Sequence, residues 1–182
     1  MGEIYPAEYD NLVDAAGGVA GGEQLCLAIN DLLRSDDPAA ADAAADAWCR
    51  WEDRIATLSG SVQRSPRFLD PRIRLGFARV VTHYFGNGAF LPDDAITGSV
   101  DGIAHIPTTL VRGRLDIASP LRPIYELSTA LPNAHLHILE DAGNGPDQAG
   151  APIIRLSRHE CGSIPGLMAS DCLAGKGIRY AG

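Results

Sequence analysis

The sequence predicts an α/β protein in which helical segments come first and a strand–helix–strand unit comes last. Two observations predict this order. Apolar residues recur at helical spacing through much of residues 1–90, and no segment there reads as a strand. Residues 108–139 then hold two short apolar segments joined by a helical one. Because parallel strands need such a crossover connection, this part predicts one βαβ unit.

The composition is that of a folded protein. The chain has 182 residues, 46% of them hydrophobic, which suits one domain with a packed core. Its formal net charge of -8 argues against nucleic-acid binding, because such surfaces gather Lys and Arg on one face. We therefore expect no nucleic-acid partner.

The sequence also indicates neither a membrane nor a metal. No apolar segment approaches the roughly 18 residues of a membrane span, and the first residues lack the basic and apolar regions of a signal peptide. The cysteines show neither C-x-x-C nor a zinc-like pairing with histidines. We expect no cofactor, no metal and free thiols in a cytoplasmic protein. The cysteines are Cys26, Cys49, Cys161 and Cys172.

Residues 1–90 predict four helices. The second carries an apolar stripe at i, i+3, i+4, i+7 and i+8, starting at Leu25. The third and fourth are each introduced by an aspartate followed by a proline, Asp37-Pro38 and Asp70-Pro71, which is typical of a capped helix start. The predicted helices cover residues 6–16, 23–35, from 38 onward, and 71 to about 85.

The second half of the third helix places a carboxylate beside two indoles. Trp48 and Trp51 form an apolar face that Ile55 and Leu58 continue, and Glu52 follows Trp51 directly. In one interpretation the tryptophans are core and the glutamate is solvated or paired with an arginine. In the other, Glu52 is a site residue.

The segment Thr108–Arg112 predicts a buried strand that stops at Gly113 and is followed by Asp116. A helix over 121–131 leads to a second strand over 134–139. Sheets of this kind place functional groups beyond the carboxyl ends of their strands, so Asp116 is a candidate site residue. Two strands alone are too few to be stable without further strands.

Five short motifs follow one another along the chain. They are Trp48-x-x-Trp51-Glu52, Ala78-Arg79-Val80-x-x-His83-Tyr84-Phe85, His105-Ile106-Pro107, Val111-x-Gly113-Arg114-Leu115-Asp116 and Asp141-Ala142-Gly143. Together they resemble those of proline iminopeptidases, which are serine enzymes of the α/β-hydrolase fold, over about residues 5–150. The resemblance implies a helical cap domain over 1–90 and, over 91–150, the last βαβ part of an incomplete hydrolase core. Residues 151–182 would be an atypical, poorly packed tail, because Gly and Pro interrupt any long helix there.

The resemblance implies roles for individual residues. Asp116 matches the acid of the catalytic triad, which holds the catalytic imidazole in its working tautomer. Glu52 matches a cap glutamate that binds the free N-terminal amine of the substrate, and Trp48 and Trp51 would form an apolar wall for the prolyl ring.

Other positions depart from the family. No serine lies in a G-x-S-x-G motif, and the glycine-rich oxyanion loop is absent. The position of the catalytic histidine holds Asn144, which cannot accept a proton from serine near neutral pH. Val81 stands where a second cap glutamate is expected. Of the five histidines only His159, in the tail, lies outside these motifs and the last strand.

Three functions remain open. The chain is the C-terminal portion of a prolyl aminopeptidase acting on proline-initiated peptides, inactive alone and dependent on an N-terminal hydrolase half as its partner. Alternatively, it is a non-catalytic remnant. A third possibility is a binding module whose cap keeps a pocket for a small amine or a partner.

Overall fold

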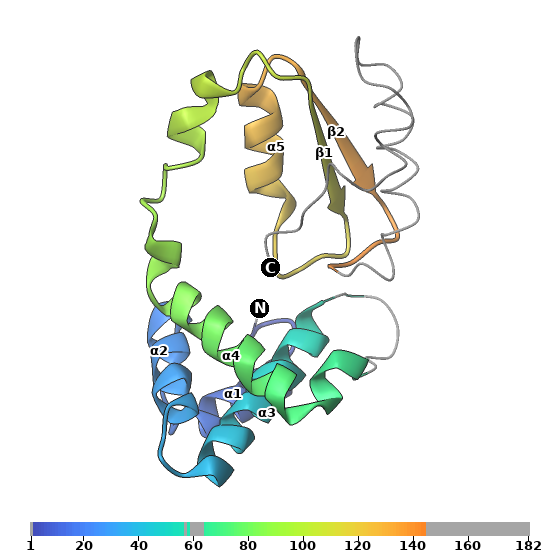
Figure 1. Ribbon diagram of the computed structural model, residues 1–182. Helices are drawn as coiled ribbons and strands as arrows, with labels where there is room; N and C mark the ends of the chain where they lie inside the picture. Colours follow the sequence, from blue (N-terminus) through green and yellow to red (C-terminus); the bar gives the residue numbers. More distant parts are fainter. Residues whose placement is uncertain (1, 57, 59–63, 145–182) are drawn as a thin grey trace. The chain divides into compact units, whose positions relative to one another are not determined.

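The computed structural model describes residues 2–56, 58 and 64–144. The chain divides into two compact units, which we call the helical unit, residues 1–56 with 60–95, and the sheet unit, residues 57–59 with 96–182. Figure 1 shows the helices α1 to α4 in the first and the strands β1 and β2 with α5 in the second. The tail 151–182, with His159, Cys161 and Cys172, lies outside the described residues. None of the described helices is long and apolar enough to span a membrane.

The four predicted helices of the helical unit are confirmed. Asp37 and Asp70 cap α3 and α4 as predicted, because their carboxylates accept the backbone N–H of Ala39 at 2.9 Å and of Arg72 at 2.8 Å. Short 3-10 turns flank α4. The elements are α1 (Pro6–Ala15), α2 (Gly22–Leu33), α3 (Pro38–Ile55), η1 (Pro66–Leu69), α4 (Pro71–Gly86) and η2 (Gly88–Phe90).

The core of the helical unit lies between α2, α3 and α4. The alanine-rich half of α3 lets its neighbours approach closely, since Ala41, Ala44 and Ala45 are all buried. Ile29, Leu33, Cys49 and Phe68 are almost completely buried as well. The core is therefore supplied by the predicted stripe of α2 and by one face of α3.

One sequence expectation in this unit needs correction. The prediction that Leu58 continues the apolar face of the third helix is wrong, because α3 ends at Ile55 and Leu58 is 47% exposed. The apolar residues Ile73, Val80 and Tyr84 of α4 are about half exposed. The buried residues of α4 are instead Ala78, Thr82 and Gly86.

The predicted βαβ arrangement of the sheet unit is confirmed. β1 (Thr108–Gly113) and β2 (Ala134–Leu139) pair in parallel, in a register that sets Thr108 opposite Ala134 and Gly113 opposite Leu139. α5 (Leu121–Ala130) connects them and packs beside both strands (Figure 1). A 3-10 helix, η3 (Thr97–Gly102), precedes β1. With two described strands, most strand residues are only half-buried.

Candidate functional site

Asp116 lies in the loop directly after β1, where the sequence predicts it. Its side chain is only 2% exposed. One carboxylate oxygen, Oδ1, accepts the backbone N–H of Ser119 at 3.0 Å, and the other, Oδ2, lies 3.2 Å from Nη1 of Arg112. Burial raises the pKa of Asp116, and the Ser119 and Ala118 N–H groups and the Arg112 charge oppose that rise. Asp116 is thus a buried carboxylate whose oxygens are already held.

The loops after β1 and β2 lie side by side. The Leu115 N–H donates to the Ala142 carbonyl at 2.9 Å, and the Arg114 N–H donates to the Leu139 carbonyl at 2.9 Å. The approach at Gly113 is so close that a Cβ there would lie 2.3 Å from the Ala142 oxygen. Parallel pairing brings both strand ends to one edge, so the loop of Asp116 adjoins the loop that leads to Asn144.

Asn144 itself is exposed at the end of this second loop. Nearby, Arg114 forms a bidentate ion pair with Glu140. Its Nε lies 2.6 Å from one carboxylate oxygen, and its Nη2 lies 2.7 Å from the other. That pair links the two loops at the surface, where an ion pair contributes little to stability.

Glu52 lies on α3 in the helical unit and is half-buried. Burial raises the pKa of Glu52 to about 7, against the opposing effects of the Arg67 charge and of the Trp48 indole. No arginine forms an ion pair with Glu52 among the described residues, so the structure shows no arginine partner for it. A carboxylate that gains and loses its proton near neutral pH can receive a cationic group.

The two tryptophans have different surroundings. Trp48 is 3% exposed, and its indole N–H has no acceptor of normal hydrogen-bond geometry in the described part of the chain, although it lies near enough to Glu52 to influence its pKa. Trp51 is 6% exposed and packs against the Tyr9 ring of α1, with ring centroids 5.6 Å apart. The structure therefore brings Trp48 near Glu52, while Trp51 packs against Tyr9.

The remaining candidates contribute less. Val81, at the expected second glutamate position, is half-buried on α4. His83 packs its ring 5.3 Å from that of Phe90, which is a structural contact. His135 and His137 lie on β2 as predicted. The structure thus places Trp48, Trp51 and Glu52 in the helical unit, and Asp116 and Asn144 in the sheet unit.

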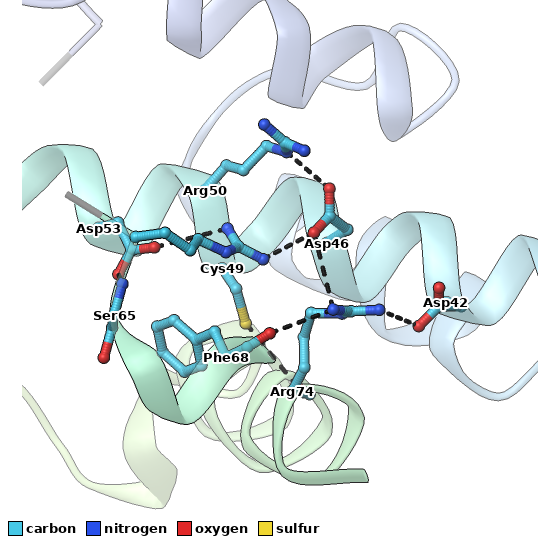
Figure 2. Close-up of polar contacts among 9 residues, drawn as sticks. Asp42, Asp46, Cys49, Arg50, Asp53, Ser65, Phe68 and Arg74 are labelled. Atoms are coloured by element: carbon cyan, nitrogen blue, oxygen red, sulfur yellow. Dashed lines mark hydrogen bonds and ion pairs between the residues drawn. The ribbon is translucent and has the colours of Figure 1, made fainter. Parts of the chain in front are cut away.

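A network of arginines and aspartates around α3 was not anticipated from the sequence. Asp46 accepts from Arg50 and Arg64, both at 2.6 Å, and Arg74 reaches Asp42 and the Phe68 carbonyl (Figure 2). Arg64 also lies 3.5 Å from Asp53, whose side chain is 7% exposed and accepts the Ser65 N–H at 3.3 Å. The network ties residues 64–74 to α3.

Burial acts on these aspartates in opposition to the arginines. At Asp46 burial acts to raise the pKa, but the hydrogen bond and charge of Arg50, with Arg64 and Arg74, bring that pKa below its ordinary value. At Asp53 burial dominates and raises the pKa despite Ser65 and Arg64. The i, i+4 spacing of Asp46 and Arg50 was a readable signal for one pair. No comparable signal in the sequence indicated the longer-range partners. The same is true of the pairing of Arg112 with Asp116 across a turn.

Comparison with known proteins identifies relatives but no matching protein-family model. The chain is 36% identical over 148 residues to a proline iminopeptidase of Arabidopsis thaliana, 38% over 154 residues to a probable proline iminopeptidase of Streptomyces coelicolor, and 33% over 143 residues to a proline iminopeptidase of Neisseria gonorrhoeae. These matches cover 81%, 82% and 77% of the chain, but only 39%, 47% and 44% of the relatives. The chain thus spans less than half the length of the relatives that it matches.

Proposed function

We propose, from the premise that this chain is related to proline iminopeptidases over about four fifths of its length, that it forms the helical cap and the last βαβ part of an α/β-hydrolase. The whole enzyme would be a prolyl aminopeptidase-like serine hydrolase that removes N-terminal proline from peptides. One observation carries the proposal most directly. The Asp116 loop and the loop leading to Asn144 are joined by the Leu115–Ala142 hydrogen bond at the carboxyl edge of two parallel strands.

In this proposal Asp116 is the triad acid. Its carboxylate is buried and fixed before any imidazole arrives, which suits a group that orients a histidine and stabilises its cation. The adjacent position, Asn144, supplies no base. Within the 182 residues no serine stands in a G-x-S-x-G elbow either. Catalysis would therefore need a nucleophile and a base from another polypeptide segment.

Glu52 is the proposed receptor for the substrate's free amine. The carboxylate is half-buried near the buried Trp48, so an ammonium group would meet an opposite charge in surroundings of reduced polarity. With Val81 on α4, this chain offers one cap carboxylate in place of two. Amine binding at Glu52 does not require the triad. The same observation favours a second candidate function, a non-catalytic module that binds a small amine.

Activity measurements on the purified 182-residue chain test the proposal. We expect no release of proline from proline arylamides above background, because losing a triad serine or histidine typically costs about 10⁶-fold in turnover. Mixing with a separate chain that carries the serine elbow should produce activity, and Asp116→Ala should abolish it. Saturable proline release by the chain alone, surviving Asp116→Ala, would contradict the proposed mechanism.

Calorimetry with proline amide separates the enzyme portion from the binding module. The enzyme portion and the binding module both predict that proline amide binds the chain. In both cases Glu52→Gln should weaken that binding strongly, and Glu52→Asp should weaken it less. Activity on mixing, with Asp116 required, favours the enzyme portion. Binding without any activity on mixing favours the module, and the absence of both would leave the non-catalytic remnant.

A further inference from the structure

Arg112 and Asp116 are brought together by the turn at the end of β1. Arg112 is a residue of the strand, opposite Ile138 of β2. The chain then turns, and the Asp116 N–H points back to the Gly113 carbonyl at 3.4 Å. As a result Nη1 of Arg112 lies 3.2 Å from Oδ2 of Asp116, four residues later. The turn therefore brings the Arg112 and Asp116 side chains within reach of each other.

The Asp116 carboxylate divides its two oxygens between different partners. Oδ1 accepts from the Ser119 backbone within the loop. Oδ2 has the Arg112 guanidinium. A carboxylate with 2% exposure is costly to keep charged without a counter-charge. Arg112 supplies that charge, and each carboxylate oxygen can accept more than one donor, so Oδ2 keeps room for a further N–H.

Arg112 is the arginine in this loop that is free to serve Asp116. The neighbouring Arg114 is committed to both oxygens of Glu140 and is 44% exposed. The Arg112 side chain is 28% exposed, and its Nε is buried without an acceptor among the residues that the structure describes. Arg112 therefore contacts Asp116 through one edge of the guanidinium and leaves another donor unused.

We propose that Arg112 is a positioning residue that holds the Asp116 carboxylate charged and oriented, independently of any histidine. Its meaning for catalysis rests on the proposed function, since Asp116 is the triad acid only in that proposal. The coupling between the two residues is nonetheless a property of this chain. In the sheet unit's described residues, Arg112 is the charged group in contact with Asp116, while Arg114 and Glu140 pair with each other.

Carbon-13 NMR titration of the Asp116 carboxyl, assigned by its loss in Asp116→Asn, tests this role. We expect Arg112→Met to raise the pKa of Asp116 by one unit or more, a tenfold change in proton affinity, and Arg112→Lys to restore part of the difference. Arg114→Met is the matched control and should leave the titration of Asp116 unchanged. An unchanged Asp116 titration in folded Arg112→Met would overturn the proposal.

A second measurement covers the case in which Arg112→Met does not fold. The double variant Arg112→Met with Asp116→Asn removes both charges, so it should recover folded protein if the unpaired carboxylate is the cause. Failure of the double variant to recover would overturn the pairing. The proposed function can fail separately from the positioning role. If Arg112→Met raises the pKa of Asp116 but no mixture releases proline, the positioning role of Arg112 stands and the proposed hydrolase function is contradicted.

Discussion

The side-chain amide of Asn30 on α2 donates a 2.8 Å hydrogen bond to the hydroxyl oxygen of Thr82 on α4, inside the core of the helical unit. The same amide donates to the Arg79 carbonyl at 3.1 Å, and the Thr82 hydroxyl donates to the Ala78 carbonyl at 2.7 Å. Both residues are buried, at 5% and 0% exposure, so these bonds replace ones that water would otherwise provide. They fix α2 against α4.

Thr82→Val should therefore destabilise the helical unit. Valine keeps the shape of threonine but removes the hydroxyl, which leaves the Asn30 amide one partner short in the core. We expect a loss of about 1–3 kcal/mol in the free energy of unfolding, measured by urea denaturation. Thr82→Ser keeps the hydroxyl and should lose less. An unchanged free energy of unfolding in Thr82→Val would show that the hydrogen bond does not contribute to stability.

Gly113→Ala should disrupt the edge that carries Asp116. A Cβ at this position would lie 2.3 Å from the Ala142 oxygen and 2.7 Å from the Gly143 oxygen, both in the backbone, so the two loops would have to separate. We expect a loss of about 1–3 kcal/mol, seen as a lower melting temperature in a thermal scan. Gly76→Ala is the control, because a Cβ there meets nothing within 4 Å. Inside α4 that change should stabilise by about 0.5–1 kcal/mol.

The elements that could be predicted from sequence are those with local causes. Asp37 and Asp70 cap their helices through bonds to residues two positions later, and the stripe of α2 depends only on helical spacing. β1 follows from a short apolar segment that stops at glycine. Asp116 could be placed after β1 for the same reason.

The features that could not be predicted depend on partners far apart in sequence. α3 ends at Ile55, three residues before Leu58, and the Leu58 N–H donates to the distant Leu115 carbonyl at 3.1 Å. Ile73 and Val80 of α4 are about half exposed, whereas Ala78 and Thr82 of the same helix are buried. The bond between Arg64 and Asp46 spans 18 residues, and spacing alone does not reveal it.

Arg64 and Arg50 both contact Asp46 and provide a comparison within the network around α3. Arg64→Met should cost about 1–3 kcal/mol in unfolding free energy, because it leaves the buried Asp53 carboxylate without its counter-charge and Asp46 with fewer donors. Arg50→Met should change stability by about 0.5 kcal/mol or less, because Arg50 is 73% exposed. Chemical denaturation of both variants provides the measurement. Equal losses of unfolding free energy in the two variants would mean that the burial of Asp53 does not add to the contribution of Arg64.

The stability of the chain should depend on pH through Glu52. The folded pKa is about 7 and lies above the unfolded value of 4.5, so the folded state holds this proton more tightly. The contribution is fully present below pH 4.5 and is lost as the pH rises toward and through 7. A shift of this size corresponds to on the order of 3 kcal/mol. Unfolding free energies measured from pH 4.5 to 8 should fall accordingly.

Glu52→Gln isolates that contribution. Glutamine has the shape of protonated glutamate and cannot ionise, so the variant should match the parent chain near pH 4.5 and exceed it in stability at pH 8. Glu52→Asp keeps a carboxylate and should retain the pH dependence. The same proton controls amine binding: proline amide should bind the parent chain more tightly at pH 7.5 than at pH 5.5, because the carboxylate must be charged to meet the ammonium. Binding that Glu52→Gln leaves intact, or that does not change over this pH interval, would place the amine elsewhere.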